Sequence, residues 1–234
     1  MSNVILRQDF HVTLVNVAGN DDMICNAARV SVHGFESADP KGNAGLIEFL
    51  MKNRHGSPFE HGLMTFRIEA PIFVWREFMR HRIGFSYNEQ SGRYMEMRPE
   101  FYIPNPGRPL IQKGKPGAYE FVAGEREHHD LMFDTMRDSY QISWGAYKLM
   151  LQAGIAKEVA RMTLPVATYS SAYVTCNPRS LMSFLSLRTR DTLSKFPSYP
   201  QWEIEQVAFM MEDRFCELWP LTARSFTSNG RVAP

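Results

Sequence analysis

The sequence has little of several features that usually direct a functional assignment. Its three cysteines, Cys25, Cys176 and Cys216, are an odd number without metal-site spacing, so we expect free thiols in a reducing compartment. No apolar run approaches membrane-spanning length and the first residues do not resemble a signal peptide, so we expect a cytoplasmic location. The net charge of +1 argues against a general attraction to nucleic acid or to membrane surfaces.

A second absence concerns glycine. No Gly-x-Gly-x-x-Gly follows a strand pattern, which excludes the usual dinucleotide-binding fingerprint of a doubly wound fold. The 234 residues, 44% of them hydrophobic and 22% charged, are enough to bury a large core. Neither an internal repeat nor a linker interrupts the chain, so we expect residues 1–234 to form a single domain.

The most informative stretch that is present runs from Arg80 to Tyr94 and reads RHRIGFSYNEQSGRY. Arginine presents a planar set of donors that matches two phosphate oxygens at once. Ser91 and the backbone beside Gly92 can complete such an anion site. The stretch therefore predicts a binding loop for a small anionic ligand, and the alternative is an exposed turn whose charges are solvated.

Hydrophobic periodicity predicts a mixed α/β fold, with a central, mostly antiparallel sheet and flanking helices rather than a Rossmann fold. In one expected strand, Met64, Phe66 and Ile68 alternate with polar residues and should face the core. Asn43 and Asn177 are the expected N-caps of two helices. Strands are expected near residues 10–17, 63–69 and 167–175. Helices are expected near residues 21–29, 43–53, 71–80, 125–153, 156–164, 177–188 and 201–218, and an irregular loop at 104–116.

The segment His55–His61 gathers side chains that can bind a ligand or titrate. His55 and His61 lie on either side of Glu60, an arrangement that invites comparison with a metal site. Their spacing does not fit a helical two-histidine site, and Pro58 interrupts any helix, so no metal is expected.

These residues resemble the signature of a known family. The triplet Arg80-His81-Arg82, an eight-residue spacer and Ser91-Gly92-Arg93-Tyr94 resemble the motif of the flavin-dependent thymidylate synthases. The resemblance extends, in order, over roughly residues 25–220. It includes the turn His55-Gly56-Ser57-Pro58-Phe59-Glu60-His61, the segment Asn177-x-Arg179-Ser180-Leu181 and the pair Leu187-Arg188.

The resemblance implies reductive methylation of dUMP to dTMP, with methylenetetrahydrofolate as carbon donor and NADPH as reductant acting through bound FAD. It also implies a homotetramer with active sites at subunit interfaces. Arg188 matches the residue that stabilises the uracil ring after loss of its N3 proton, so no protein nucleophile is needed. The implied dUMP-binding residues are Glu77, Arg80, Glu89, Ser91, Gly92, Arg93, Arg161 and Arg188. The implied FAD-binding residues are Ser31, His55, Ser57, Arg80, His81, Arg82, Glu89, Asn177, Arg179 and Ser183.

The sequence departs from the family pattern at several positions. The spacer from Ile83 to Gln90 is one residue longer than in many relatives. Glu77 stands where a glutamine is usual, and Ser183 where an asparagine is common. The segment after Arg188 lacks a histidine often found there, so one flavin contact is expected to be missing or replaced.

Two hypotheses from other functional classes of protein remain open. The basic and aromatic residues between Arg80 and Arg93 also suit an RNA-binding module, although the small net charge argues against it. A helical scaffold protein with a basic surface loop is a third reading. Cys176 would be the nucleophile if catalysis were covalent, but we interpret it as a small buried residue. A yellow colour of the purified protein would separate the flavoenzyme from the other two classes.

Overall fold

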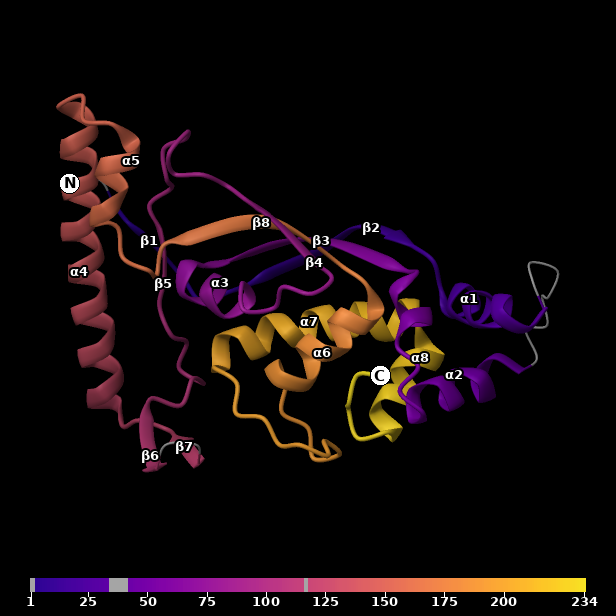
Figure 1. Ribbon diagram of the computed structural model, residues 1–234. Coiled ribbons are helices and arrows are strands. Elements are labelled where there is room, and N and C mark those ends of the chain that lie inside the picture. The colour runs from indigo at the N-terminus through magenta and orange to yellow at the C-terminus, as the bar shows by residue number, and fades with distance from the viewer. Residues whose placement is uncertain (1–2, 34–41, 116–117) are drawn as a thin grey trace. The chain divides into compact units, whose positions relative to one another are not determined.

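The computed structural model describes residues 3–33, 42–115 and 118–234 (Figure 1). The chain divides into two compact units, each assembled from three separate segments. Unit 1 consists of Met1–His11, Glu69–Phe78 and Glu89–Ala172, and unit 2 of Val12–Ile68, Met79–Asn88 and Tyr173–Pro234. The expectation of a single domain over residues 1–234 stays a prediction.

The largest sheet has four strands in the order β2-β3-β8-β4. Its strands are β2 (His11–Ala18), β3 (Leu63–Pro71), β8 (Tyr169–Cys176) and β4 (Phe85–Glu89). The three predicted strands correspond to β2, β3 and β8. The predicted mixed α/β class, with a mostly antiparallel central sheet and flanking helices, is confirmed.

Strand β3 shows the alternation expected of a half-buried strand. Met64, Phe66 and Ile68 are each 0% exposed. On the opposite face, the hydroxyl of Thr65 lies 2.9 Å from that of Thr175 in β8, so the two hydroxyls form a hydrogen bond. Because side chains of a strand alternate between its faces, the predicted core-facing set is confirmed.

Unit 1 combines short strands with a long helix. β1 (Ile5–Arg7) pairs in parallel with β5 (Glu100–Tyr102), and β6 (Ile111–Lys115) pairs antiparallel with β7 (Ala118–Val122). α3 (Ile72–Phe78) follows β3, and α4 (Arg126–Gln152) matches the helix predicted near 125–153. α5 (Lys157–Ala160) and the 3₁₀ turn η4 (Arg161–Thr163) lie against α4 (Figure 1).

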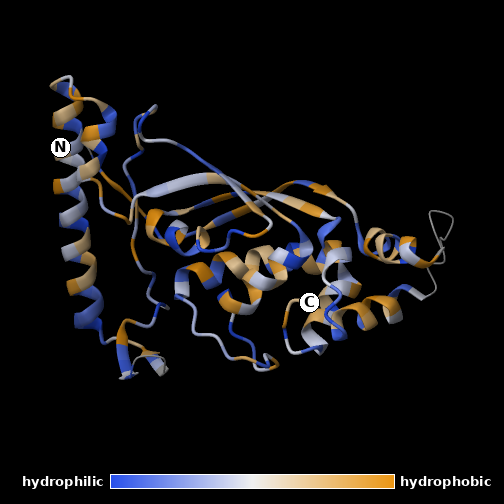
Figure 2. Cartoon of the chain, in the orientation of Figure 1, coloured by the Kyte–Doolittle hydropathy of each residue, from blue (hydrophilic) through white to orange (hydrophobic). Residues whose placement is uncertain are grey.

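Helix α4 is amphipathic. Figure 2 shows that hydrophilic and hydrophobic residues are mixed along it. Its buried side chains, Tyr140, Trp144 and Tyr147, recur at helical spacing, which places them on one face. None of the described helices combines the length and the apolar character needed to cross a membrane.

Unit 2 carries most of the remaining helices. They are α1 (Asp21–His33), α2 (Asn43–Lys52), the 3₁₀ turn η3 (Ser57–Glu60), α6 (Pro178–Arg188), α7 (Trp202–Leu218) and α8 (Pro220–Ser228). α8 packs against α2 and α7. The sequence analysis predicts no helix beyond residue 218, because a proline such as Pro220 usually ends a helix. Pro220 instead occupies the first turn of α8, where its missing N–H has no helical acceptor.

Two predictions about helix starts are corrected by the structure. Asn43 is not an N-cap, because Gly42 holds that position and the buried Asn43 donates from Nδ2 to Asp22 at 2.6 Å. The helix expected from Pro71 begins at Ile72 and ends at Phe78, so Arg80 lies beyond it rather than within it.

Two segments predicted to be loops contain strands. The proline- and glycine-rich stretch at 104–116 includes β6, which is defined by its pairing with β7 rather than by an alternating pattern of its own. The stretch from Arg80 to Tyr94 includes β4, which pairs with β8. β6 pairs with the next strand along the chain and β4 pairs with a distant one, and local composition reveals neither pairing.

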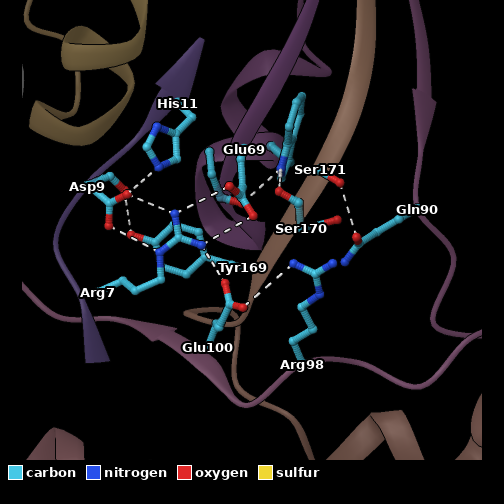
Figure 3. Close-up of polar contacts among 12 residues, drawn as sticks. Arg7, Asp9, His11, Glu69, Gln90, Arg98, Glu100, Tyr169, Ser170 and Ser171 are labelled. Atoms are coloured by element: carbon cyan, nitrogen blue, oxygen red, sulfur yellow. Dashed lines mark hydrogen bonds and ion pairs between the residues drawn. The ribbon is translucent and has the colours of Figure 1, made fainter. Parts of the chain in front are cut away.

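Residues of β3, β5 and β8 gather around one arginine of β1 in unit 1 (Figure 3). The guanidinium of Arg7 is hydrogen-bonded to Asp9 at 2.8 Å, ion-paired with Glu69 at 3.2 Å and bonded to Glu100. It also lies over the ring of Tyr169, 4.2 Å from its centroid. The hydrogen bonds from Arg7 hold the pKa of Asp9 below its usual range, so this carboxylate is ionised at neutral pH.

A testable consequence for unit 2 concerns Asp21, which is 7% exposed and caps α8 from the start of α1. Its carboxylate accepts from the N–H of Leu221 at 2.8 Å, and from the N–H and hydroxyl of Thr222 at 3.1 and 2.7 Å. Replacing Asp21 by alanine leaves these donors without their acceptor. We expect a loss of about 2 kcal/mol in the free energy of unfolding, measured by urea denaturation.

The matched control for this measurement is Asp213→Ala, because Asp213 is exposed on α7. Its free energy of unfolding should stay within about 0.5 kcal/mol of the parent. Equal stability of the Asp21 and Asp213 variants would show that the capping role assigned to Asp21 is wrong.

Candidate functional site

Unit 1 contains a cavity of about 530 Å³, which falls in the range of small-molecule sites. We call it the unit 1 cavity. Its polar lining comes from the end of β4 and the segment after it, from α3, from η4 and from β8. The lining residues are Ile72, Arg76, Glu89, Gln90, Ser91, Gly92, Met97, Arg161, Met162, Leu164, Pro165, Val166 and Ser170.

The two residues at the start of this polar lining are held by β8. The hydroxyl of Ser170 donates to the carboxylate of Glu89, and Ser171 bonds the side chain of Gln90 at 3.1 Å. The N–H of Gln90 also donates to the carbonyl of Ser171 at 2.9 Å. Burial raises the pKa of Glu89, and the bond from Ser170 opposes this shift.

Gly92 allows the chain to pass close to its neighbours. A Cβ at this position would lie 3.1 Å from Sδ of Met97 and 3.2 Å from Cδ of Arg161. The turn that contains it is closed by the N–H of Tyr94, which donates to the carbonyl of Ser91 at 3.0 Å. A side chain at Gly92 would therefore push against Arg161, which lines the same cavity.

Arg93, one of the implied dUMP-binding residues, is paired with a carboxylate in this structure. Its Nε lies 3.2 Å from a carboxylate oxygen of Glu158, and neither residue lines the unit 1 cavity. Both side chains are about half exposed, so this ion pair is weak and can exchange for a ligand.

Unit 2 contains a second cavity, of about 560 Å³, which we call the unit 2 cavity. It is formed by the turn before β4, the start of β4, and α6. The lining residues are Arg80, His81, Arg82, Ile83, Phe85, Ser180, Ser183, Leu187 and Arg188. The structure thus brings the Arg80-His81-Arg82 triplet together with Arg188, more than a hundred residues away in the chain.

Arg188 and His81 are directly bonded. Nε of Arg188 donates to Nε2 of His81 at 3.0 Å, so the imidazole accepts at Nε2 and carries its proton at Nδ1. Burial, and then the charge of Arg188, lower the pKa of His81 to about 4. His81 is therefore neutral at physiological pH and can keep accepting from Arg188. The ring also packs edge-on against Phe184, with centroids 4.9 Å apart.

The chain that follows α6 is fixed by a second arginine. Arg231 is 4% exposed and donates to the hydroxyl of Thr189, the residue after Arg188, at 2.7 Å. It also forms a two-pronged contact with Glu212, at 2.6 and 2.9 Å. Arg190 is held in turn by the buried carboxylate of Glu205 at 2.8 Å. The two residues that follow α6, Thr189 and Arg190, are therefore each fixed by a side-chain contact.

Gly84 sits where no other residue would fit. Its φ is +67°, and a Cβ there would lie 2.0 Å from Oγ of Ser180. Asn177 lies close by and caps α6, with its side chain accepting from the N–H of Ser180 at 2.8 Å, so this N-cap prediction is confirmed.

The remaining predicted flavin residues are spread over unit 2. Arg179 donates to Glu60 and to the carbonyl of Pro234, and it passes against Gly56. The ring of His55 lies 5.7 Å from that of Phe49, and Ser57 opens η3. Ser31 is exposed on α1 and donates to the carbonyl of Ala28 at 2.9 Å. None of these lines the unit 2 cavity, and Glu77 lines neither cavity.

The donor set of the unit 2 cavity suits a phosphate-bearing cofactor such as FAD. The guanidinium groups of Arg80 and Arg82 form no ion pair or hydrogen bond with any residue that the structure describes. Ser180 and Ser183 add hydroxyls to the same lining. Cationic and hydroxyl donors without protein partners are what a pyrophosphate requires. Across residues 3–33, 42–115 and 118–234, no group of His, Cys, Asp or Glu could hold a metal ion.

Three polar residues that line the unit 1 cavity were missed by the sequence analysis: Arg76, Gln90 and Ser170. Arg76 lies one helical turn before Arg80 in the sequence, and this spacing was the available signal. Ser170 is hydrogen-bonded to Glu89 only because β8 pairs with β4. No local sequence pattern predicts that strand pairing.

Comparison with known proteins places this geometry in context. The family model described as "Thymidylate synthase complementing protein" matches residues 13–221. The flavin-dependent thymidylate synthase of Streptomyces coelicolor is 54% identical over 234 residues, covering 98% of this chain and 95% of the relative. That of Tropheryma whipplei (strain TW08/27) is 50% identical over 234 residues, covering 98% of this chain and 97% of the relative.

A solved structure is similar over the same extent. The UMP/dUMP methylase PolB from Streptomyces cacaoi, in crystals with 5-Br UMP and with 5-Br dUMP, matches with a TM-score of 0.93. The identities are 45% and 46%, and the matches cover 99% of this chain and 100% of that chain. Similarity of this extent runs through both units and through both cavities. The chain belongs to the family of the flavin-dependent thymidylate synthases.

Proposed function

We propose that the protein methylates dUMP to dTMP reductively, using methylenetetrahydrofolate as carbon donor and NADPH as reductant through bound FAD. The observation that carries the proposal is that Arg188 and the Arg80-His81-Arg82 triplet line one cavity. The names of the relatives and the nucleotide analogues bound by PolB support it. A yellow protein that forms dTMP from these substrates is the direct test, and a colourless protein that binds RNA would favour the alternative.

The nucleotide phosphate is assigned to the unit 1 cavity. Ser91 and Gly92 supply a hydroxyl and a close backbone approach, and Arg161 supplies a fixed positive charge. Glu89 and Arg93, together with Glu77 and Arg80, complete the dUMP-binding set that the family motif implies. Arg93 would exchange its exposed partner Glu158 for the phosphate.

Arg188 is proposed to activate the uracil ring. A guanidinium beside N3 and O2 stabilises the anion that forms when N3 loses its proton. Arginine stays charged at any working pH, so Arg188 is not the proton acceptor. The bond from its Nε to neutral His81 fixes the plane of the guanidinium before the nucleotide arrives. This fixed orientation is the preorganisation that electrostatic catalysis requires.

FAD is proposed to be held by Arg80, His81 and Arg82, and by the other implied residues: Ser31, His55, Ser57, Glu89, Asn177, Arg179 and Ser183. When bound, the flavin supplies the redox chemistry that carries reducing equivalents to the new methyl group. We further propose that the protein works in the cytoplasm.

A second nucleotide substrate is also a candidate. PolB is described as a methylase of both UMP and dUMP, and it is 45% identical to this chain. The methylation assay should therefore compare dUMP with UMP at equal concentration. Product from dUMP alone would restrict this chain to thymidylate synthesis.

The first prediction for this function concerns Arg188. Arg188→Ala should lower the single-turnover rate of dTMP formation by roughly a hundredfold to a thousandfold, because one preorganised contact to the developing charge is removed. FAD should stay bound and NADPH should still reduce it. Arg188→Lys should recover little, since a point charge does not reproduce the two-pronged contact.

The control for Arg188 is Arg93→Ala, which should chiefly weaken dUMP binding because a phosphate contact acts on ground state and transition state alike. A normal rate at saturating dUMP in Arg188→Ala, with only affinity reduced, would contradict the activating role.

The second prediction concerns Cys176, which is 1% exposed and whose pKa is strongly raised by burial. A thiol in this state is a poor nucleophile. Cys176→Ala should therefore keep most of the flavin-dependent dTMP formation. A loss of several orders of magnitude, with folding and flavin content preserved, would point to covalent catalysis instead.

The third prediction concerns assembly. We propose a homotetramer in which each active site takes residues from more than one subunit. Exposed apolar side chains of α4, including Leu131, Ile142 and Leu149, are consistent with burial between subunits. Analytical ultracentrifugation should give about four times the chain mass of 27.0 kDa. A fully active species at the mass of one chain would refute the tetramer.

A further inference from the structure

We infer that Arg76, which the family motif does not include, is a further ligand of the nucleotide phosphate in the unit 1 cavity. This inference rests on the proposed function, since it assumes that dUMP binds there. It starts from the cavity lining, which contains the two arginines Arg76 and Arg161 and one carboxylate, that of Glu89. The lining therefore carries an excess of positive charge.

Neither cavity arginine is neutralised by the protein. The guanidinium groups of Arg76 and Arg161 form no ion pair or hydrogen bond with any residue that the structure describes. Other arginines of unit 1 do find carboxylate partners: Arg7 pairs with Asp9, and Arg93 with Glu158. An arginine that lines a concave site without a protein partner is available to an anionic ligand.

The carboxylate in the cavity does not compensate these charges. Glu89 is bonded to the hydroxyl of Ser170 rather than to an arginine. Its single carboxylate is also outnumbered by the two arginines of the cavity lining. A nucleotide monophosphate, which carries about two negative charges at pH 7, restores the balance that Glu89 leaves incomplete.

Arg76 and Arg161 come from different elements, α3 and η4, so they can approach a phosphate from two directions. Ser91 and Gly92 provide the hydroxyl and backbone contacts between them. Arg93, the motif arginine, is instead engaged by Glu158. Arg76 thus supplies a charge that is already directed to the cavity before the ligand arrives.

The test separates the phosphate from the rest of the nucleotide. Dissociation constants for dUMP and for deoxyuridine, which lacks the phosphate, are measured by calorimetry on the FAD-loaded parent protein and on Arg76→Ala. We expect Arg76→Ala to weaken dUMP about 10- to 100-fold and to leave deoxyuridine unchanged. Arg76→Lys should recover part of the loss, since it keeps the charge but not the planar donor set.

Two further measurements make the outcome unambiguous. Inorganic phosphate should compete with dUMP less well in Arg76→Ala than in the parent. If deoxyuridine binds too weakly to measure, this competition tests whether Arg76 binds the phosphate. In steady state, KM for dUMP should rise while kcat stays near that of the parent. Arg137→Ala is the matched control, because Arg137 belongs to unit 1, lies on α4 and is paired with Asp134 and Asp138.

The possible failures are distinguishable. If the parent protein binds dUMP but Arg76→Ala weakens dUMP and deoxyuridine equally, or weakens neither, the role of Arg76 is wrong while the proposed function stands. If the FAD-loaded parent protein binds neither dUMP nor inorganic phosphate, both the proposed function and the role of Arg76 are wrong. Equal loss of dUMP affinity in Arg137→Ala would show a general charge effect and would also overturn the assignment.

Discussion

An arginine largely removed from water has to be surrounded by acceptors, and this requirement organises the strands of unit 1. The side chain of Arg7 is 15% exposed, and its carboxylate partners come from β3, from β5 and from the connection after β1. Removing one partner would leave charge uncompensated, which costs more than the pair contributes. Glu69 lies just before α3, and Tyr169 lies next to Ser170. The same cluster therefore positions both segments that bring Arg76 and Ser170 to the cavity.

Unit 2 also contains a buried arginine that is surrounded by acceptors. Arg231 is buried, and its partners Thr189 and Glu212 lie on the chain after α6 and on α7. Its backbone φ is +56°, an unfavourable value for a residue with a side chain, so the contacts of the guanidinium have to offset local strain. Arg188 is the residue next to Thr189. The geometry of the Arg188–His81 bond is therefore supported by residues that do not line the unit 2 cavity.

The sequence alone predicted the family, the main strands and most of the long helices. The family depends on short motifs, and the strands and helices depend on local periodicity. The sequence reached Arg188 and the Arg80–Arg82 triplet through the motif, and the structure then placed them in one cavity. The sequence could not predict the hydrogen bond between Ser170 and Glu89, because this bond requires the pairing of β4 with β8. Nor could it show that Arg93 faces Glu158, because side-chain direction on an exposed turn is set by neighbours distant in sequence.

The burial of Cys176 has a consequence for inhibitor chemistry. Electrophilic compounds that trap a catalytic cysteine need a thiolate within their reach, and here the thiol is both covered and protonated. Warheads developed against cysteine-dependent thymidylate synthases would find no reaction partner at this position. Selective compounds would have to rely on reversible recognition instead, with an anionic group directed to the arginines and a planar ring system beside them.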